Sequence, residues 1–488
     1  FLHHDKKHSY IKDLKIELPK SYIYTDSIYL SYHADNKGNN REIINIYNNN
    51  INAVVHAQDL VFLSNELKSV DNTININLRI QGNEKTVFIP SFKANTPDGS
   101  FVLNTGISIR DWQERNSTWG VENLTLKART DFYEDILTAF HVDEDIVSKI
   151  SKTGEIKLTL DAAGDNKDLI AQGNLVTQAG AAKFKSNLYN DHLTADITAE
   201  EIDLNQILSD ERFGKLTADL SISGQKAHSS LTGIVKGEIT NFTFNNFNYK
   251  DVDFTVKALN NQYDFEIDSE DPQCIISANG SAISDKMLRH IKINATCDNI
   301  NLRALNITDR WGDSDMRGSI SADIDMNHTG MPKGWVKVDN YPPIGSDNNY
   351  SLNKLSINSN DTTILLDSDF GHVEICGNYN YKTIGSSIMD IINSRLSFTD
   401  KSTSKASKKQ NRFRLNAEIK DTEWLKSIFG IPAEISSPLT MRGSVDDSKK
   451  TISLSCNLPY IKYNGSEYKD INAYIRTPND TLQAYATI

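Results

Sequence analysis

The chain has 488 residues, of which 38% are hydrophobic, and its 52 basic and 64 acidic side chains give a net charge of −12. That length is large for one compact core. A negative chain without a basic stripe has no means of displacing counterions from a polyanion, so we expect no nucleic-acid partner. No apolar run approaches the roughly 20 residues of a membrane-spanning helix.

Alternation of apolar and polar residues is the dominant pattern along the chain. It is clear at 74–80, 193–197, 252–256, 291–297, 413–419 and 452–458. Such alternation is typical of strands with one apolar and one solvated face. It predicts an all-β, mainly antiparallel sheet with short polar turns, and it argues against a doubly wound α/β fold.

Two sequence units recur. A glycine-bounded segment of alternating residues occupies 154–164 and 214–224, and a third copy begins at Gly318 and closes late at Gly330. Residues 242–254 and 461–473 share the pattern Tyr-Lys-Asp-apolar-Asp/Asn. Repeats of this kind indicate one stacked supersecondary unit, so we expect an elongated sheet whose function is spread along a surface.

Helical periodicity is confined to short segments, at 131–150, 204–208, 302–311, 386–396 and 423–430. A short apolar helix that follows a strand is suited to covering a sheet edge or the end of a cavity. We therefore expect a few capping helices on a β protein.

The domain organisation is predicted from changes in composition. We expect an N-terminal β segment at 1–130, repeats with short helices at 131–398, a mobile Ser/Lys-rich loop at 399–411 and a further, truncated repeat at 412–488. The chain opens on Phe1 and stops at Ile488 within a predicted strand, so we expect an internal piece of a longer protein.

The four cysteines do not form a metal-binding or redox motif. A hairpin that turns near 284–286 would place Cys274 opposite Cys297. The pattern leaves two alternatives open, a cross-strand disulfide or buried thiols that behave as small apolar residues.

The search for catalytic and metal-binding motifs is negative. Phosphate-binding, dinucleotide-binding and zinc-protease motifs are absent from the sequence, and Asp369-Phe370-Gly371 stands without the other kinase motifs. Three histidines, His3, His4 and His8, lie at the terminus, where we expect the chain to fray, and His372 and Glu374 alternate on a polar strand face that we expect to be solvated. The acidic residues of 361–369 lack the central glycine of a calcium-binding loop. We therefore predict no catalytic residues, no metal, no cofactor and no enzymatic activity.

An alternating sheet must cover its apolar face. A sandwich or a parallel β-helix packs that face against itself, whereas an open, curled sheet leaves a trough. Periodicity does not separate these arrangements, and on its own it favours a self-packed core.

Several segments together resemble the AsmA/TamB-like family of Gram-negative envelope proteins, especially its Bacteroidetes members. They are the strand–helix–strand segments 202–224 and 300–326, the turns 249–253 and 468–472, and the segment 364–396. The resemblance runs from about residue 60 to the end and depends on the order of the elements. It implies a β-taco, a sheet curled into a half-pipe with an apolar interior.

The resemblance also implies a function and a location. Such proteins bridge the periplasm, conduct phospholipid between the inner and outer membranes and so support outer-membrane biogenesis. An inner-membrane helix at the N-terminus and contact with a TamA-type outer-membrane barrel, as in the translocation and assembly module, are implied outside this chain. Alternation places the following residues on the inward, groove-lining face: Ile156, Leu158, Leu160, Leu193, Ile197, Leu216, Leu220, Ile222, Val252, Phe254, Val256, Ile291, Ile293, Ile320, Ile324, Leu415, Ile419, Ile452 and Leu454.

Two other functions remain open at this point. One is an assembly scaffold that works with a TamA-type barrel and presents a strand edge to nascent outer-membrane proteins by β-augmentation. The other is a self-packed β-helix that acts as an adhesin or binds polysaccharide.

Overall fold

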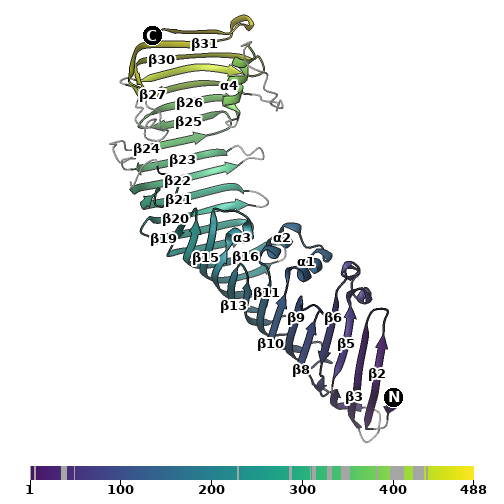
Figure 1. The fold of residues 1–488 in the computed structure, drawn as a ribbon. Coiled ribbons are helices and arrows are strands. Elements are labelled where there is room, and N and C mark those ends of the chain that lie inside the picture. Colours follow the sequence, from purple (N-terminus) through teal and green to yellow (C-terminus); the bar gives the residue numbers. More distant parts are fainter. Residues whose placement is uncertain are drawn as a thin grey trace. The chain divides into compact units, whose positions relative to one another are not determined.

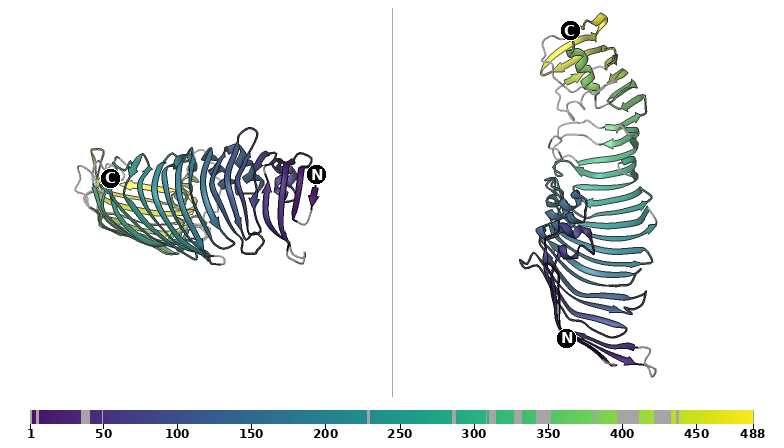
Figure 2. Two further views of the ribbon diagram at one scale, coloured as in Figure 1. Left: turned by 90° about the horizontal axis from the view of Figure 1, so that it is seen from below. Right: turned by 90° about the vertical axis from the view of Figure 1, so that its right-hand side faces the viewer.

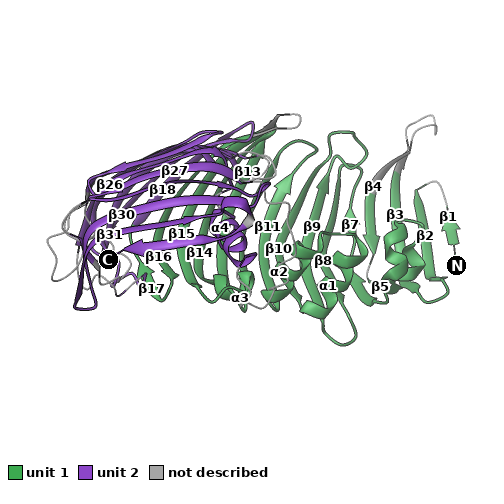
Figure 3. Cartoon of the chain, turned by 90° about the horizontal axis from the view of Figure 1, so that it is seen from above, with its two compact units in different colours: residues 1–251 green, residues 252–488 purple. Residues whose placement is uncertain are grey.

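The computed structural model describes residues 2–4, 7–34, 41–48, 50–227, 230–284, 288–307, 309, 315–326, 332–341, 352–380, 383–395, 411–420, 433–435 and 438–487. The chain divides into two compact units, residues 1–251 (unit 1) and 252–488 (unit 2), coloured separately in Figure 3. In both units nearly all regular structure is β-strand, as the alternation predicted (Figure 1).

Unit 1 is an antiparallel sheet in which most strands pair with their neighbours in sequence. From β8 to β17 the pairing follows chain order without interruption, and in the N-terminal part β3 pairs with β2, β4 and β5. Its strands are β1 (Leu2–His4), β2 (His8–Glu17), β3 (Tyr22–Ala34), β4 (Arg41–Asn48), β5 (Ile51–His56), β6 (Thr73–Leu78), β7 (Gln81–Gly82), β8 (Thr86–Asn95), β9 (Phe101–Arg110), β10 (Thr118–Ala128), β11 (Ile156–Gly164), β12 (Leu169–Thr177), β13 (Gly180–Tyr189), β14 (His192–Asp203), β15 (Phe213–Ala227), β16 (Ser230–Phe244) and β17 (Phe247–Tyr249).

Unit 2 is built in the same way. Its strands pair antiparallel in chain order from β18 to β27 and continue through β29, β30, β31 and β32, while β28 pairs with β30. Figure 2 shows the strands of each unit side by side from two further directions. They are β18 (Val252–Leu259), β19 (Gln262–Asp271), β20 (Cys274–Ser284), β21 (Leu288–Asn301), β22 (Asp315–Met326), β23 (Pro332–Tyr341), β24 (Leu352–Ser359), β25 (Thr363–Ser368), β26 (Gly371–Asn378), β27 (Arg412–Ile419), β28 (Ala433–Ile435), β29 (Leu439–Asp446), β30 (Thr451–Tyr463), β31 (Ser466–Arg476) and β32 (Gln483–Thr487).

Left-handed residues interrupt several strands at bulges. Asn123 (φ 51°) lies at the bulge of β10, and Glu201 (φ 51°) lies at the bulge of β14. The repeated Tyr-Lys-Asp pattern places Asp251 (φ 53°) and Asp470 (φ 52°) in the same conformation. Asn and Asp are the side chains that tolerate this region best, so the second sequence repeat encodes a repeated backbone irregularity.

The helices are short and agree in part with their predicted positions. Segment 204–208 forms α3 (Leu204–Leu208), and segment 386–396 corresponds to α4 (Ile384–Asn393). Segment 131–150 forms two helices, α1 (Thr130–Ala139) and α2 (Glu144–Lys152), because His141 is left-handed (φ 55°) and Asp143 caps a new helix. The 3₁₀ turns are η1 (Ala57–Leu60), η2 (Asn65–Ser69) and η3 (Pro478–Asp480).

Two helix predictions have other outcomes. In 302–311, the described residues 302–306 form consecutive turns and residue 307 a bend, so a helix there was a wrong prediction. Asn306 is left-handed (φ 55°), which ends helical continuation. Segment 423–430 lies outside the described residues, as does all of the predicted loop 399–411 except Asn411. The predicted four-part domain organisation remains a prediction.

Candidate functional site

In unit 1 the strand register aligns apolar residues into an uninterrupted row across the sheet. Directly opposed residues of antiparallel strands point to the same face, so a chain of opposed pairs traces one line on that face. Each member of this first apolar row is opposed to the next: Ile16, Ile23, Ala53, Ile76, Ala94, Leu103, Leu126, Leu158, Leu175, Ala182, Ala199, Ala218 and Ile239.

Unit 2 has a row of the same kind, the second apolar row, and it too contains no polar side chain. It consists of Val256, Phe265, Gly280, Ile293, Ala322, Val336, Ile357, Leu366, Val373, Ala417, Met441, Cys456, Ala473 and Ala486. A row that crosses every strand from β18 to β27 and then β29 to β32 is a property of register as well as of composition, because a slip of one residue would turn a strand's apolar set to the other face.

The opposite face of the sheet carries charged and hydroxyl side chains. Lys183 of β13 lies diagonal to Glu200 of β14, two residues beyond its directly opposed partner Thr198, and the two charged side chains form an ion pair at 2.6 Å. Thr198 donates a hydrogen bond to Asp219 at 2.6 Å on the adjoining strands. Since these residues alternate with the first apolar row, the sheet of unit 1 has one apolar and one polar face.

The apolar face of unit 1 is incompletely covered. Among the described strand residues of this unit, the apolar side chains that are buried are all alanines, namely Ala53, Ala94, Ala128, Ala199 and Ala218. The larger members of the first row, such as Leu158 and Leu175, are only half-buried. A second packed layer would bury leucine and isoleucine side chains fully, so these residues do not form a filled core.

The register places the predicted lining residues of each unit on the face of that unit's apolar row. Leu158 belongs to the first row, and Val256 and Ile293 belong to the second. Most of the set is half-buried, but Leu193 is 42% exposed and Ile452 only 2%. Their role as the lining of a groove remains a prediction.

Two glycines of this face lie beneath aromatic rings. A Cβ atom built on Gly173 would come within 2.8 Å of the Phe184 ring, and one built on Gly280 would come equally close to Phe265. Each phenylalanine is directly opposed to its glycine. Each ring therefore lies over its glycine, close to the sheet. A side chain in place of the glycine would push the ring away from the sheet.

At one end of the strands of unit 1, α1 covers the margin of the apolar face (Figures 1 and 3). Phe132 and Tyr133 are buried there against Ala128, with Phe101 and Ile156 packed around them. The Tyr133 hydroxyl donates to the carbonyl of Gly154 at 2.8 Å, which fixes the helix to the start of β11. The neighbouring helices are linked as well, since Gln206 of α3 donates to the Lys152 carbonyl of α2 at 2.6 Å.

In unit 2, α4 covers strands β27, β29 and β30 much more tightly. Ile391 of α4 packs with Phe413, Val445 and Ile452, and these four side chains are at most 4% exposed. Half-buried residues of the adjoining strands, including Leu454 and Ile475, pack around this cluster. Here the apolar face is part of a true core.

Beside this cluster the last strands of unit 2 form an apolar pocket of about 530 Å³. Met441, Cys456 and Ala473 contribute from the second apolar row, and Leu454 and Ile475 are shared with the α4 cluster. The small residues Ala473, Ala484 and Ala486 leave the space that larger side chains would fill. Its size and lining suit an apolar ligand.

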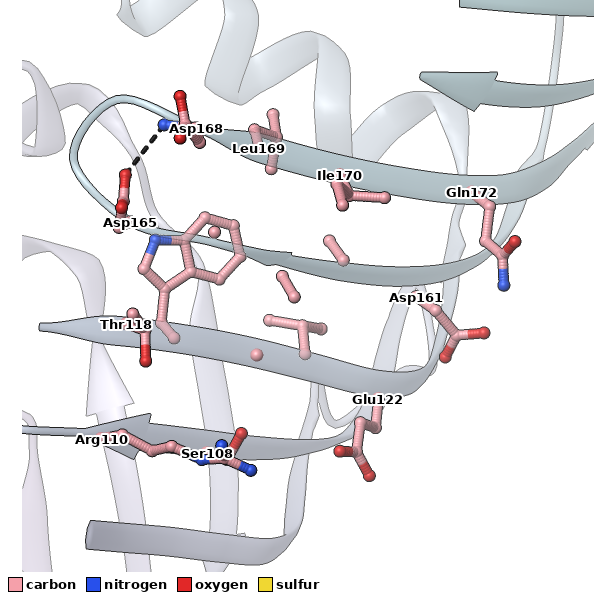
Figure 4. Close-up of a pocket in the computed structure, with 16 residues that line it drawn as sticks. Ser108, Arg110, Thr118, Glu122, Asp161, Asp165, Asp168, Leu169, Ile170 and Gln172 are labelled. Atoms are coloured by element: carbon pink, nitrogen blue, oxygen red, sulfur yellow. Dashed lines mark hydrogen bonds between the residues drawn. The ribbon is translucent and has the colours of Figure 1, made fainter. Parts of the chain in front are cut away.

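A second pocket, of about 730 Å³, lies over β9 to β12 and is lined in part by carboxylates (Figure 4). Asp165 accepts hydrogen bonds from the backbone N–H groups of Lys167 and Asp168 at 2.7 and 2.8 Å, and these bonds lower its pKa. Asp161 accepts from the N–H of Asn123 at 2.8 Å. These two carboxylates hold a turn and a bulge in place.

The cysteines do not have the opposed arrangement expected from a regular hairpin. Cys274 is opposite Ile300 and Cys297 is opposite Ile276, in a hairpin whose register shifts between Ile283 and Ser284 and again between Ile275 and Ile276. All four cysteines are free thiols, and burial raises the pKa of the Cys297 thiol to about 11.

The candidate metal residues of 361–374 have protein partners in the structure. His372 faces Asp367 at 3.5 Å, Lys333 pairs with Asp361, and Asp369 accepts backbone hydrogen bonds from Asn353 and Lys354. Within the described residues no group of three or more His, Cys, Asp or Glu side chains is placed to hold a metal ion. None of the described helices has the length and apolar character needed to cross a membrane.

Comparison with protein-family models, with curated proteins and with solved structures yields no match. The apolar rows and their partial coverage are therefore the features on which a functional proposal must rest.

Proposed function

We propose that this protein is a lipid-transport protein of the cell envelope, in which the apolar face of a curled sheet conducts phospholipid between the inner and outer membranes. The observation that carries the proposal is the first apolar row, which crosses the sheet of unit 1 without a polar residue and whose large side chains are only half-buried. The resemblance to AsmA/TamB-like proteins supplies the half-pipe shape, the periplasmic location and the identity of the cargo.

The energetics favour such a surface for acyl chains. Exposing a CH₂ group to water costs about 0.8 kcal/mol, so moving the two tails of a phospholipid through water faces a barrier on the order of 20 kcal/mol. A continuous apolar face lowers this barrier at every position, while the headgroup stays in solvent. Because the row consists of leucine, isoleucine and alanine without a charged residue, no single position would trap the cargo.

The proposal also accounts for the chemistry that the sheet displays. The polar face is occupied by ion pairs and hydroxyl contacts, which suit contact with solvent. The carboxylates of the larger pocket serve the backbone. In the described strand pairs the pairing is antiparallel, whereas a parallel β-helix adhesin would be built from parallel pairs.

The test is the lipid content of the purified chain, measured by mass spectrometry after extraction. We expect phospholipid to copurify with the protein, and we expect Leu158→Asp to lower the amount several-fold because it places a charge in the first apolar row. Thr159→Asp is the matched control, since it adds the same charge to the next residue, whose side chain is exposed on the polar face.

Amide hydrogen exchange of β11 and its neighbours shows whether both variants keep the sheet folded. Absence of phospholipid from the wild-type chain, or equal lipid content in the two folded variants, would contradict the proposal.

A further inference from the structure

The helix α4 lies on the surface that, under the proposed function, acyl chains would occupy. It covers Phe413, Val445 and Ile452 at the ends of three neighbouring strands, and its Ile391 is itself 3% exposed. In unit 1 the buried apolar side chains of the described strand residues are all alanines. The helix therefore fills, in unit 2, space of the kind that unit 1 leaves open.

The covered area is continuous with the apolar pocket of β29 to β32. Leu454 and Ile475 belong both to the pocket wall and to the side chains packed around the α4 cluster. An acyl chain in this pocket would reach the side of the helix, and its path toward the strand ends would be closed by Ile391. Displacement of α4 would join the two areas into one apolar surface.

The helix is held in position by a buried polar network as well as by apolar contact. Asn411 is 1% exposed; its side-chain amide donates to Ser387 at 2.6 Å and to Thr383 at 2.9 Å. Ser387 in turn donates to Asp447 at 2.9 Å, and Asp447 also accepts the backbone N–H of Asn411 at 2.8 Å. Directional bonds of this kind specify one docked position of the helix, which apolar packing alone would not do.

We infer that α4 is an intramolecular cover that competes with acyl chains for the strand ends of β27, β29 and β30. The inference rests on the proposed function and specifies how lipid access would be controlled in unit 2. With α4 docked, lipid on these strands is confined to the pocket beside the helix. With α4 displaced, it extends over Phe413, Val445 and Ile452.

The test uses a phosphatidylcholine with a photoreactive diazirine in its acyl chain, supplied in phosphatidylcholine vesicles, and peptide mapping of the labelled sites. Ile391→Asp places a charge in the contact and should displace the helix. Met389→Asp adds the same charge to the same helix at a side chain that is 54% exposed, so it is the matched control. We expect Ile391→Asp to raise labelling of the β27, β29 and β30 peptides several-fold and Met389→Asp to leave it unchanged.

The outcomes separate the inference from the proposed function. One outcome would contradict the inference that α4 is a cover but would leave the proposed lipid transport supported. In it, peptides around Leu158 and Leu175 are labelled in every variant, and β27 to β30 are labelled equally in wild type and Ile391→Asp. Absence of labelling at all of these sites would overturn both. If hydrogen exchange shows that Ile391→Asp unfolds β27 to β30, the milder variant Ile391→Ala takes its place. Raised labelling of β27, β29 and β30 in Ile391→Ala would support the cover, and unchanged labelling would contradict it.

Discussion

The strands of unit 1 and strands β27, β29 and β30 of unit 2 share one sequence pattern but differ in what becomes of their apolar face. In unit 1, Leu158 and Leu175 stand half-buried in an apolar row, whereas Val445 and Ile452 beneath α4 are 1% and 2% exposed. The difference comes from a single helix of ten residues. Alternation thus determines that a strand has an apolar face, and a separate element determines whether that face is core or surface.

The strongest way to test this comparison is to remove apolar volume from both regions. Ile452→Ala should lower the free energy of unfolding of its region by about 2–5 kcal/mol, because it removes buried methyl groups and leaves a cavity beneath α4. Ile197→Ala, at a half-buried position in unit 1, should cost about 1 kcal/mol, since solvent already reaches this side chain.

Native-state hydrogen exchange of β30 and β14 measures the two effects in separate regions, so a two-state transition of the whole chain is not required. Equal losses at the two positions would show that the face of unit 1 is also a packed core.

A smaller effect is expected from the polar tether of α4. Asn411→Ala removes the donor to Ser387 and Thr383 and the acceptor of the Asn380 N–H, so the groups left without partners should cost about 1–3 kcal/mol. Exchange of the α4 amides should accelerate accordingly. Asn187→Ala, at an exposed position on β13, should change stability by no more than about 0.5 kcal/mol. Unchanged α4 exchange in Asn411→Ala would show that apolar packing alone holds the helix.

Substitution of a glycine that lies beneath an aromatic ring tests how closely side chains pack on the apolar face of unit 1. Gly173→Ala should destabilise β12 by about 1–3 kcal/mol, because the new methyl group meets the Phe184 ring and the Thr159 carbonyl. Gly106→Ala on β9 is the control, since its Cβ would find no atom closer than 3.7 Å. Local hydrogen exchange compares the two, and a neutral Gly173→Ala would mean that Phe184 moves away freely.

The sequence predicted the strand faces well because alternation is a local signal. The register between strands was harder to predict. The pairing of Ser284 with Leu288 and the two register shifts beyond it place Cys274 opposite Ile300 rather than Cys297, and a pattern of apolar residues does not show them. Apolar spacing in the sequence predicted the positions of α3 and α4. It did not predict which residues these helices pack against, or that Val445 would be buried. Ile452 and Leu454 alternate as Leu158 and Leu160 do, and only the tertiary contact with Ile391 distinguishes them.

The smallest expected effect concerns the capping helix of unit 1, whose attachment includes an exposed carboxylate. Asp98 accepts hydrogen bonds from the backbone and side chain of Ser100, and Arg129, just before α1, donates to it at 2.8 Å. The Ser100 bonds, with a lesser contribution from Arg129, hold the pKa of Asp98 well below its usual range. A lowered folded-state pKa stabilises the fold above the unfolded pKa of about 3.9, and that contribution is lost as the pH falls through the folded value.

Asp98→Asn should therefore slightly destabilise the start of α1 at pH 7. It should also abolish the loss of stability that protonation of this carboxyl causes as the pH falls. Hydrogen exchange of the first turn of α1 and an NMR titration of the carboxyl groups measure the two effects. Glu134→Gln removes one charge from the exposed side of α1 and should leave the Thr96–Ser100 turn unaffected. A titration of Asp98 in its usual range would show that the turn is held by the hydroxyl groups of Thr96 and Ser100, which lie 2.9 Å apart. The position of α1 would then depend on its apolar contacts with Ala128 and Phe101 and on the Tyr133 hydrogen bond to Gly154.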